Sequence, residues 1–166
     1  MSKQFFIGLK MVIADAMTRG DYNEYRGWEL PDNEIHLANE PGYLVEYVDT
    51  EDQNHPNHGG YISWSPATVF NDAYKSSGEM SFGMAIAAAR AGFKISRSGW
   101  NGAGMFAYIV PANSYPAQTA TIASSFADDM VPYKEYWALY TGDKEVATWA
   151  PSGSDSLAND WRIHES

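Results

Sequence analysis

Three small residues, Ser76-Ser77-Gly78, separate two series of short apolar segments, and this break constrains the fold most. Short runs of serine and glycine are typical of flexible linkers. On each side, the apolar runs are brief and are interrupted by glycine, proline and polar residues. A chain of 166 residues is long enough for two small domains. We therefore expect an α+β chain of two modules, 1–76 and 79–166, each a short antiparallel sheet packed with one or two helices.

The composition is that of a folded protein, because 45% of the residues are hydrophobic and 14% are aromatic. No apolar run approaches the roughly 18 residues of a membrane-spanning helix. The N-terminus also lacks the pattern of a signal peptide. The absence of cysteine excludes disulfides and thiolate metal sites and fits a cytoplasmic protein. We expect no membrane partner and no cofactor.

The charge is strongly acidic and unevenly distributed. The formal net charge is −10, which repels polyphosphate and argues against polymeric nucleic acid as a partner. Residues 1–75 carry 5 basic and 12 acidic side chains, a net of −7, whereas residues 76–166 carry 6 and 9, a net of −3. A small anionic ligand could still bind to the second module through local donors and backbone amides.

The first module reads as strand, helix, hairpin and helix. The patterns predict strands at 1–12, 43–48 and 61–64, a helix at 18–25 capped by Thr18, an acidic loop at 31–41, and a helix that starts at Ser65-Pro66 and runs to about Lys75. The polar loop 49–60 contains His55 and His58. Two histidines without a nearby partner set are more typical of a loop than of a metal site, so we predict no metal.

The second module begins with a helix at 81–91, which Ser81 caps and Gly92 ends. Its expected core stripe is Phe82, Ala85, Ile86 and Ala89. Further strands are expected at 93–97, 105–110, 135–140, 145–149 and 161–163, with one helical turn at 154–158 capped by Ser154 or Asp155. The segment 111–133 lacks periodicity and is expected to be a long loop.

The stretch Gly99-Trp100-Asn101-Gly102-Ala103-Gly104-Met105 places a large aromatic and a two-faced amide among three glycines. Glycine lets the backbone approach a ligand closely, tryptophan offers a stacking face, and asparagine offers both a donor and an acceptor. Such a stretch can hold a planar heterocycle such as a nucleobase. It can equally be a tight turn between two strands.

Two further groups of residues have the same double interpretation. Trp149 stands near Ser152, Ser154 and Asp155, whose oxygens can hold ribose hydroxyls or cap the short helix. Arg97, three residues before Trp100, can contact a phosphate or lie on a solvated strand face. Trp161 is expected in the core.

Three segments, in their order along the chain, resemble the second Thoeris anti-defence family of phage proteins. They are Met80-Ser81-Phe82-Gly83-Met84-Ala85-Ile86, Trp100-Asn101-Gly102-Ala103-Gly104-Met105-Phe106, and the run from Trp149-Ala150-Pro151-Ser152 to Ala158-Asn159-Asp160-Trp161. The resemblance covers about 79–163. The first module resembles a small domain of phage proteins, with no established activity, in the segments 25–28, 42–47 and 60–66.

The resemblance implies a sponge, meaning a protein that sequesters a bacterial immune messenger without cleaving it. The implied ligand is a cyclic nucleotide-type messenger, above all glycocyclic ADP-ribose made by TIR-domain enzymes, with cyclic dinucleotides as a further class. The implied assembly is a homo-oligomer, a dimer or a tetramer, in the cytoplasm of the infected bacterial host. The ligand residues that we predict are Arg97, Trp100, Asn101, Gly102, Trp149, Ser152, Ser154 and Asp155.

No catalytic pattern stands out in the sequence, which has no nucleophile elbow, zincin helix or P-loop. We therefore expect a binding protein rather than an enzyme. Two alternatives stay open: a hydrolase that degrades such a messenger through its acidic residues, and a phage protein-interaction module.

Overall fold

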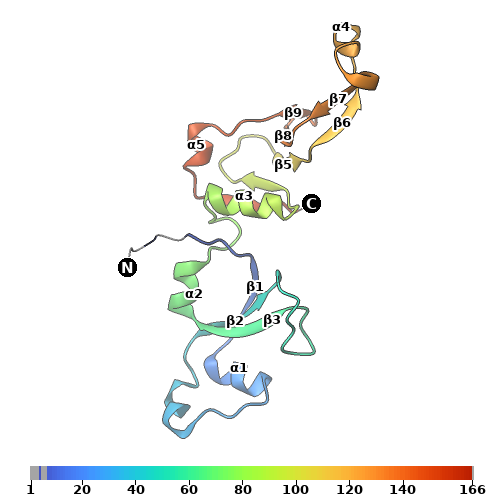
Figure 1. Ribbon diagram of the computed structural model, residues 1–166. Helices are drawn as coiled ribbons and strands as arrows, with labels where there is room; N and C mark the ends of the chain where they lie inside the picture. Colours follow the sequence, from blue (N-terminus) through green and yellow to red (C-terminus); the bar gives the residue numbers. More distant parts are fainter. Residues whose placement is uncertain (1–3, 5–6, 166) are drawn as a thin grey trace. The chain divides into compact units, whose positions relative to one another are not determined.

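The computed structural model describes residues 4 and 7–165, in two compact units (Figure 1). The first unit ends at Lys75 and the second begins at Ser76. Each unit contains an antiparallel sheet with helices, so the predicted α+β class is confirmed.

The first unit is a three-stranded antiparallel sheet in the order β1-β2-β3. Its elements are β1 (Val12–Ala16), α1 (Arg19–Tyr25), the 3-10 helix η1 (Asp32–Leu37), β2 (Gly42–Tyr47), β3 (Tyr61–Pro66) and α2 (Ala67–Ala73). Tyr22 of α1 packs on Leu44 of β2 and Ile62 of β3 to form the core. Thr18 caps α1 as predicted, because its side chain accepts a hydrogen bond from the backbone N–H of Asp21.

The structure corrects three predictions for this unit. The strand predicted at 1–12 begins at Val12, where Tyr47 of β2 is its partner; residues 7–11 lie outside any strand, and 1–3 and 5–6 lie outside the described residues. Ser65 pairs with Tyr43 in the sheet, so α2 starts after Pro66 without a side-chain cap. The loop predicted at 31–41 contains η1.

The two histidines of the 49–60 loop hold that loop to the sheet and to α1. His58 Nδ1 lies 2.8 Å from Glu46 Oε2, and His58 Nε2 lies 3.0 Å from the hydroxyl of Tyr25. Hydrogen bonds from His58 and from the backbone of Gly60 lower the pKa of Glu46. His55 stacks on Tyr25. Within the described part of the chain, no three His, Cys, Asp or Glu side chains are placed to hold a metal ion.

The second unit is built on a five-stranded sheet in the order β10-β4-β5-β8-β9. The elements in and on it are α3 (Phe82–Arg90), β4 (Ile95–Arg97), β5 (Phe106–Val110), β8 (Tyr136–Tyr140), β9 (Val146–Thr148), α5 (Gly153–Ser156) and β10 (Trp161–Ile163). Helix α3 contacts β10, β4 and β5, and this packing forms the core of the unit.

Helix α3 has the predicted ends but a shifted buried face. Ser81 caps it, and Gly92 follows it with φ of +96°, a backbone conformation that suits glycine. The buried residues are Ala85, Ala88 and Ala89, whereas Ile86 is only half-buried. Alanines let the helix lie close to the sheet, where they meet the fully buried Ile95, Ala107 and Trp161.

The predicted loop at 111–133 is instead a hairpin, and this expectation was wrong. Strands β6 (Asn113–Pro116) and β7 (Met130–Tyr133) pair with each other (Figure 1). The segment that connects them contains α4 (Ala120–Ala123) and the 3-10 helix η2 (Ala127–Asp129). Of these strand residues only Val131 is buried. Because these two strands bury almost no side chains, apolar residues do not alternate along them. The sequence therefore lacks the period-two pattern that predicts a strand.

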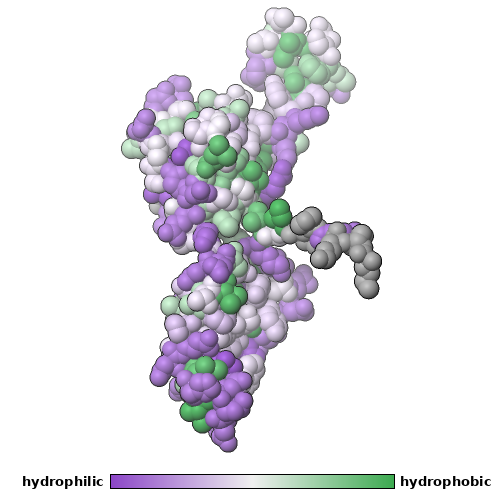
Figure 2. Space-filling view, turned by 90° about the vertical axis from the view of Figure 1, so that its left-hand side faces the viewer, coloured by the Kyte–Doolittle hydropathy of each residue, from purple (hydrophilic) through white to green (hydrophobic). Residues whose placement is uncertain are grey.

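Hydrophilic residues cover most of the face in Figure 2, where hydrophobic side chains form small separate patches. None of the helices in the described residues is long and apolar enough to cross a membrane.

Candidate functional site

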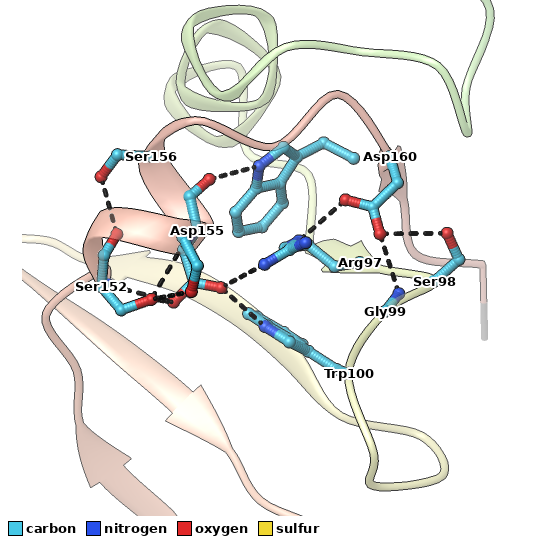
Figure 3. A network of polar contacts seen from close by, with 10 residues as sticks. Arg97, Ser98, Gly99, Trp100, Ser152, Asp155, Ser156 and Asp160 are labelled. Atoms are coloured by element: carbon cyan, nitrogen blue, oxygen red, sulfur yellow. Dashed lines mark hydrogen bonds and ion pairs between the residues drawn. The ribbon is translucent and has the colours of Figure 1, made fainter.

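Arg97, the last residue of β4, is held by two carboxylates (Figure 3). Its Nη1 donates to Asp155 Oδ1 and its Nε donates to Asp160 Oδ1, each at 2.8 Å. Hydrogen bonds to Asp160 and then to Asp155 raise the pKa of Arg97. Only 16% of its side chain is exposed. A phosphate would have to compete with both carboxylates for this guanidinium, so the structure favours a structural role for Arg97 over the predicted phosphate contact.

Asp160 ties β10 to the start of the glycine-rich turn. Its Oδ2 accepts hydrogen bonds from the backbone N–H of Gly99 at 2.8 Å and from the hydroxyl of Ser98 at 3.2 Å. The hydrogen bond from Arg97 lowers the pKa of Asp160. Asp160 is a site residue that we did not predict from the sequence. Its role depends on the pairing of Trp161 with Arg97 across β10 and β4, which local sequence does not reveal.

Asp155 lies at the centre of the network in Figure 3 and connects the turn to the short helix α5. Its Oδ1 accepts from Arg97 and, at 3.1 Å, from Trp100 Nε1. Its Oδ2 accepts from the backbone N–H and the hydroxyl of Ser152. Burial opposes ionisation of Asp155, but the hydrogen bonds from Ser152, Arg97 and Trp100 outweigh it and lower the pKa to about 2.

The cap of α5 differs from the prediction. Ser152, not Ser154 or Asp155, is the N-cap residue, and its hydroxyl accepts from the backbone N–H of Asp155. Asp155 returns the bond to the backbone of Ser152, which completes a capping box. Ser152 is thereby occupied by the helix, whereas Ser154 is exposed and its hydroxyl lies 2.9 Å from that of Ser152.

Four tryptophans and Phe82 pack beside this network. Trp100 lies edge-to-face against Trp149 at 5.8 Å and against Trp161 at 5.4 Å between ring centroids. Trp149 also meets Trp137 at 5.7 Å. Trp161 is fully buried, as predicted. Such edge-to-face packing adds stability beyond the burial of area.

The indole N–H groups divide this cluster into two kinds. Trp100 donates to the carboxylate of Asp155, and Trp161 donates to its backbone carbonyl. Trp149 and Trp137 are both half-buried, and neither indole N–H has a hydrogen-bond partner in the described part of the chain. Trp149 therefore offers both a partly exposed ring and a free donor.

Gly102 in the glycine-rich turn has no space for a side chain. A Cβ at this position would lie 2.2 Å from Met105 Sδ, so the methionine occupies the space that a side chain would need. Asn101 is exposed. Of the eight predicted residues, Asn101, Ser152 and Ser154 are exposed and Trp149 is partly open. The other four, Arg97, Trp100, Gly102 and Asp155, are held by contacts within the fold.

A cavity of about 310 Å³ lies elsewhere on the unit, beyond the C-terminal end of α3. It is lined by Ala89, Gly92, Phe93, Lys94, Phe106, Tyr108, Ile109 and Val146. None of the eight predicted ligand residues lines it. Three of the predicted residues, Asn101, Ser152 and Ser154, are instead exposed at the surface of this chain.

Comparison with known proteins links the second unit to one family. A family model described as the Thoeris anti-defense 2-like domain matches residues 80–164. The protein "Thoeris anti-defense 2" of Bacillus phage SP01 is 31% identical over 85 residues, which are 51% of this chain and 94% of that protein. The matched segment contains all eight predicted ligand residues.

Proposed function

Because the chain belongs to the Thoeris anti-defense 2-like family, we propose that it is a phage anti-defence protein that sequesters a cyclic nucleotide-type immune messenger. The preferred messenger in this proposal is glycocyclic ADP-ribose, with cyclic dinucleotides as a further class. The messenger leaves the protein uncleaved, so inhibition is by mass action: the sponge must bind more tightly than the immune effector and must outnumber the messenger.

The observation that carries this proposal is the partly open Trp149 beside the Asp155 network. Stacking of a base on an aromatic ring contributes about 1–3 kcal/mol. Trp149 presents such a ring with a free N–H donor, and Trp100 packs edge-to-face against it. The exposed side chains of Asn101 and Ser154 add hydrogen-bonding groups. These groups match a ligand that has a base and hydroxyls.

The state of the carboxylates supports binding over hydrolysis. A general acid must carry a proton near neutral pH, whereas the pKa of Asp155 is about 2. Both Asp155 and Asp160 also pair with Arg97, which makes them poor bases. Neither carboxylate is therefore suited to transfer a proton to a bound messenger.

A homo-oligomer is part of the proposal. On one chain the side chains of Asn101, Ser152 and Ser154 are exposed, whereas ligands of nucleotide size are usually bound in clefts that bury most of their surface. A second chain placed against Trp149 would supply the missing wall.

The test is ligand capture and recovery. The purified protein is incubated with glycocyclic ADP-ribose, free ligand is removed, the protein is denatured by heat, and the supernatant is analysed by mass spectrometry. We expect intact messenger in the supernatant. Converted messenger would establish the hydrolase alternative instead. If glycocyclic ADP-ribose and cyclic dinucleotides both stay entirely free, the sponge proposal is wrong.

A further inference from the structure

The segment that leads into β1, with the start of β1 itself, carries exposed apolar side chains at every second residue. Ile7, Leu9, Met11 and Ile13 are 97%, 50%, 38% and 57% exposed. Apolar residues at a spacing of two lie on one face of a β-strand. The sequence therefore has the pattern of a strand with one apolar face, yet only Val12–Ala16 pair with β2, which ends at Tyr47 opposite Val12.

The two edge strands of the three-stranded sheet differ in whether their outer backbone groups have a hydrogen-bond partner. At the β3 edge, the side-chain amide of Asn54 donates to the carbonyl of Ile62 and accepts from its N–H, at 2.8 and 2.7 Å. Asn54 thus takes the place of a neighbouring strand. Strand β1 forms the other edge, and no described strand lies beyond it. Natural proteins usually protect such edges, because open backbone groups invite pairing with another chain.

We propose that residues 9–13 pair in antiparallel fashion with the same residues of a second copy of this chain, so that two first-unit sheets become one continuous sheet. This association lies outside the family-matched segment and is independent of messenger binding. It gives the first unit the role of a self-association module.

Register and charge favour a second copy as the partner. In a two-fold antiparallel pair centred on Met11, each Met11 faces its own equivalent, and Leu9 faces Ile13. The three cross-strand pairs on this face of the strand are then apolar, and such pairs are what stabilise a sheet.

The same register places no like charges opposite each other. Residues 7–16 contain one lysine and one aspartate, Lys10 and Asp15, within a half of the chain whose net charge is −7. Lys10, at an even position, belongs to the face opposite the apolar side chains. Its Nζ lies 5.3 Å from the ring centroid of Tyr47. Residues 7–16 thus have no net charge, so two copies of the acidic first unit can pair along this edge without like charges facing each other.

The first test uses a single cysteine, for which this cysteine-free chain gives a clean background. Opposed residues of antiparallel strands have Cα atoms about 4.5–5.5 Å apart, a separation that a disulfide spans. We expect Met11→Cys in the full chain to form a covalent dimer under mild oxidation, seen on a denaturing gel. The matched control is Val69→Cys on α2, which is 59% exposed in the native residue. Equal dimer yields from the two variants would overturn the proposal.

The second test removes the contact by charge. In the double variant Leu9→Lys with Ile13→Lys, each lysine faces another lysine across the pair, so we expect the solution mass of the full chain, measured by light scattering, to fall by half. Circular dichroism and the melting temperature check that the units stay folded, since both native side chains are exposed. An unchanged mass in the folded double variant would overturn the proposal.

Discussion

Arg97 Nη1 lies 2.8 Å from Asp155 Oδ1, although the two residues are 58 positions apart in the chain. This ion pair joins the end of β4 to the first turn of α5, and Trp100 donates to the same carboxylate oxygen. The position of the indole ring in the proposed site therefore depends on a contact between two distant segments of the chain.

We expect Trp149→Phe to weaken binding of glycocyclic ADP-ribose about five- to tenfold, since the ring is kept and one free N–H donor is lost; a net hydrogen bond is worth about 0.5–1.5 kcal/mol. Isothermal titration calorimetry measures the change. Trp137→Phe is the control, because Trp137 packs on Trp149 in the same cluster but is not a predicted ligand residue. Equal losses in both variants would indicate a packing effect and remove Trp149 from the site.

The double pairing of Arg97 predicts that Arg97→Lys lowers the free energy of unfolding by about 2–3 kcal/mol. A single ammonium group cannot reproduce a planar fork that reaches two carboxylates, and a broken, largely buried pair leaves charge uncompensated. Urea unfolding followed by tryptophan fluorescence measures the change. Arg90→Lys is the control, since the Arg90–Glu135 pair has both side chains more than half exposed and such pairs contribute little. A loss no larger than that of the control would contradict this role for Arg97.

Stability should fall in acid because of Asp155. Its pKa drops from an ordinary 3.8 to about 2 on folding, so the unfolded chain takes up the proton more readily. The contribution is fully present above about pH 4 and is lost as the pH falls toward 2; at neutral pH it amounts to about 2 kcal/mol. Asp160, whose pKa is also lowered, acts in the same direction.

The variant Asp155→Asn isolates this contribution. It should be less stable than the native chain at pH 7, and the difference should shrink as the pH approaches 2. Melting temperatures across the pH series measure both effects, and Asp128→Asn, at an exposed carboxylate, serves as the control. A difference that does not change with pH would show that Asp155 contributes packing rather than charge.

Gly102→Ala should destabilise the second unit by about 1–3 kcal/mol, the usual cost of overpacking, because the new Cβ would overlap Met105 Sδ. The double variant Gly102→Ala with Met105→Ala removes the overlap, so the added methyl group should then cost nothing relative to Met105→Ala alone. Gly153→Ala is the control, since a Cβ there meets nothing within 4 Å. Thermal unfolding of the four variants tests the argument, which fails if Gly102→Ala and Gly153→Ala behave alike.

Local signals in the sequence predicted the elements whose ends are set locally. Helix α3 begins at a serine cap and ends before a glycine, and both signals lie within a few residues of the helix. The cap of α5 was harder, because Ser152, Ser154 and Asp155 can all accept a hydrogen bond, and only the backbone conformation of Ser152 selects it.

The parts that sequence could not predict depend on long-range pairing or on exposure. The Arg97–Asp160 contact requires the register of β10 on β4, and the hairpin of β6 and β7 has almost no buried face to leave a pattern. Residues 7–11 show the converse, since they have the pattern of a strand but no partner strand within the described chain.

One carboxylate, that of Asp155, fixes an arginine, a tryptophan and the start of a helix at once. A change at any of these positions disturbs the other two, so substitutions inside this network alter the scaffold of the proposed site. In the proposed sponge, adaptation to a new messenger would therefore proceed at the solvent-facing margin of the network, at positions such as Asn101 and Ser154.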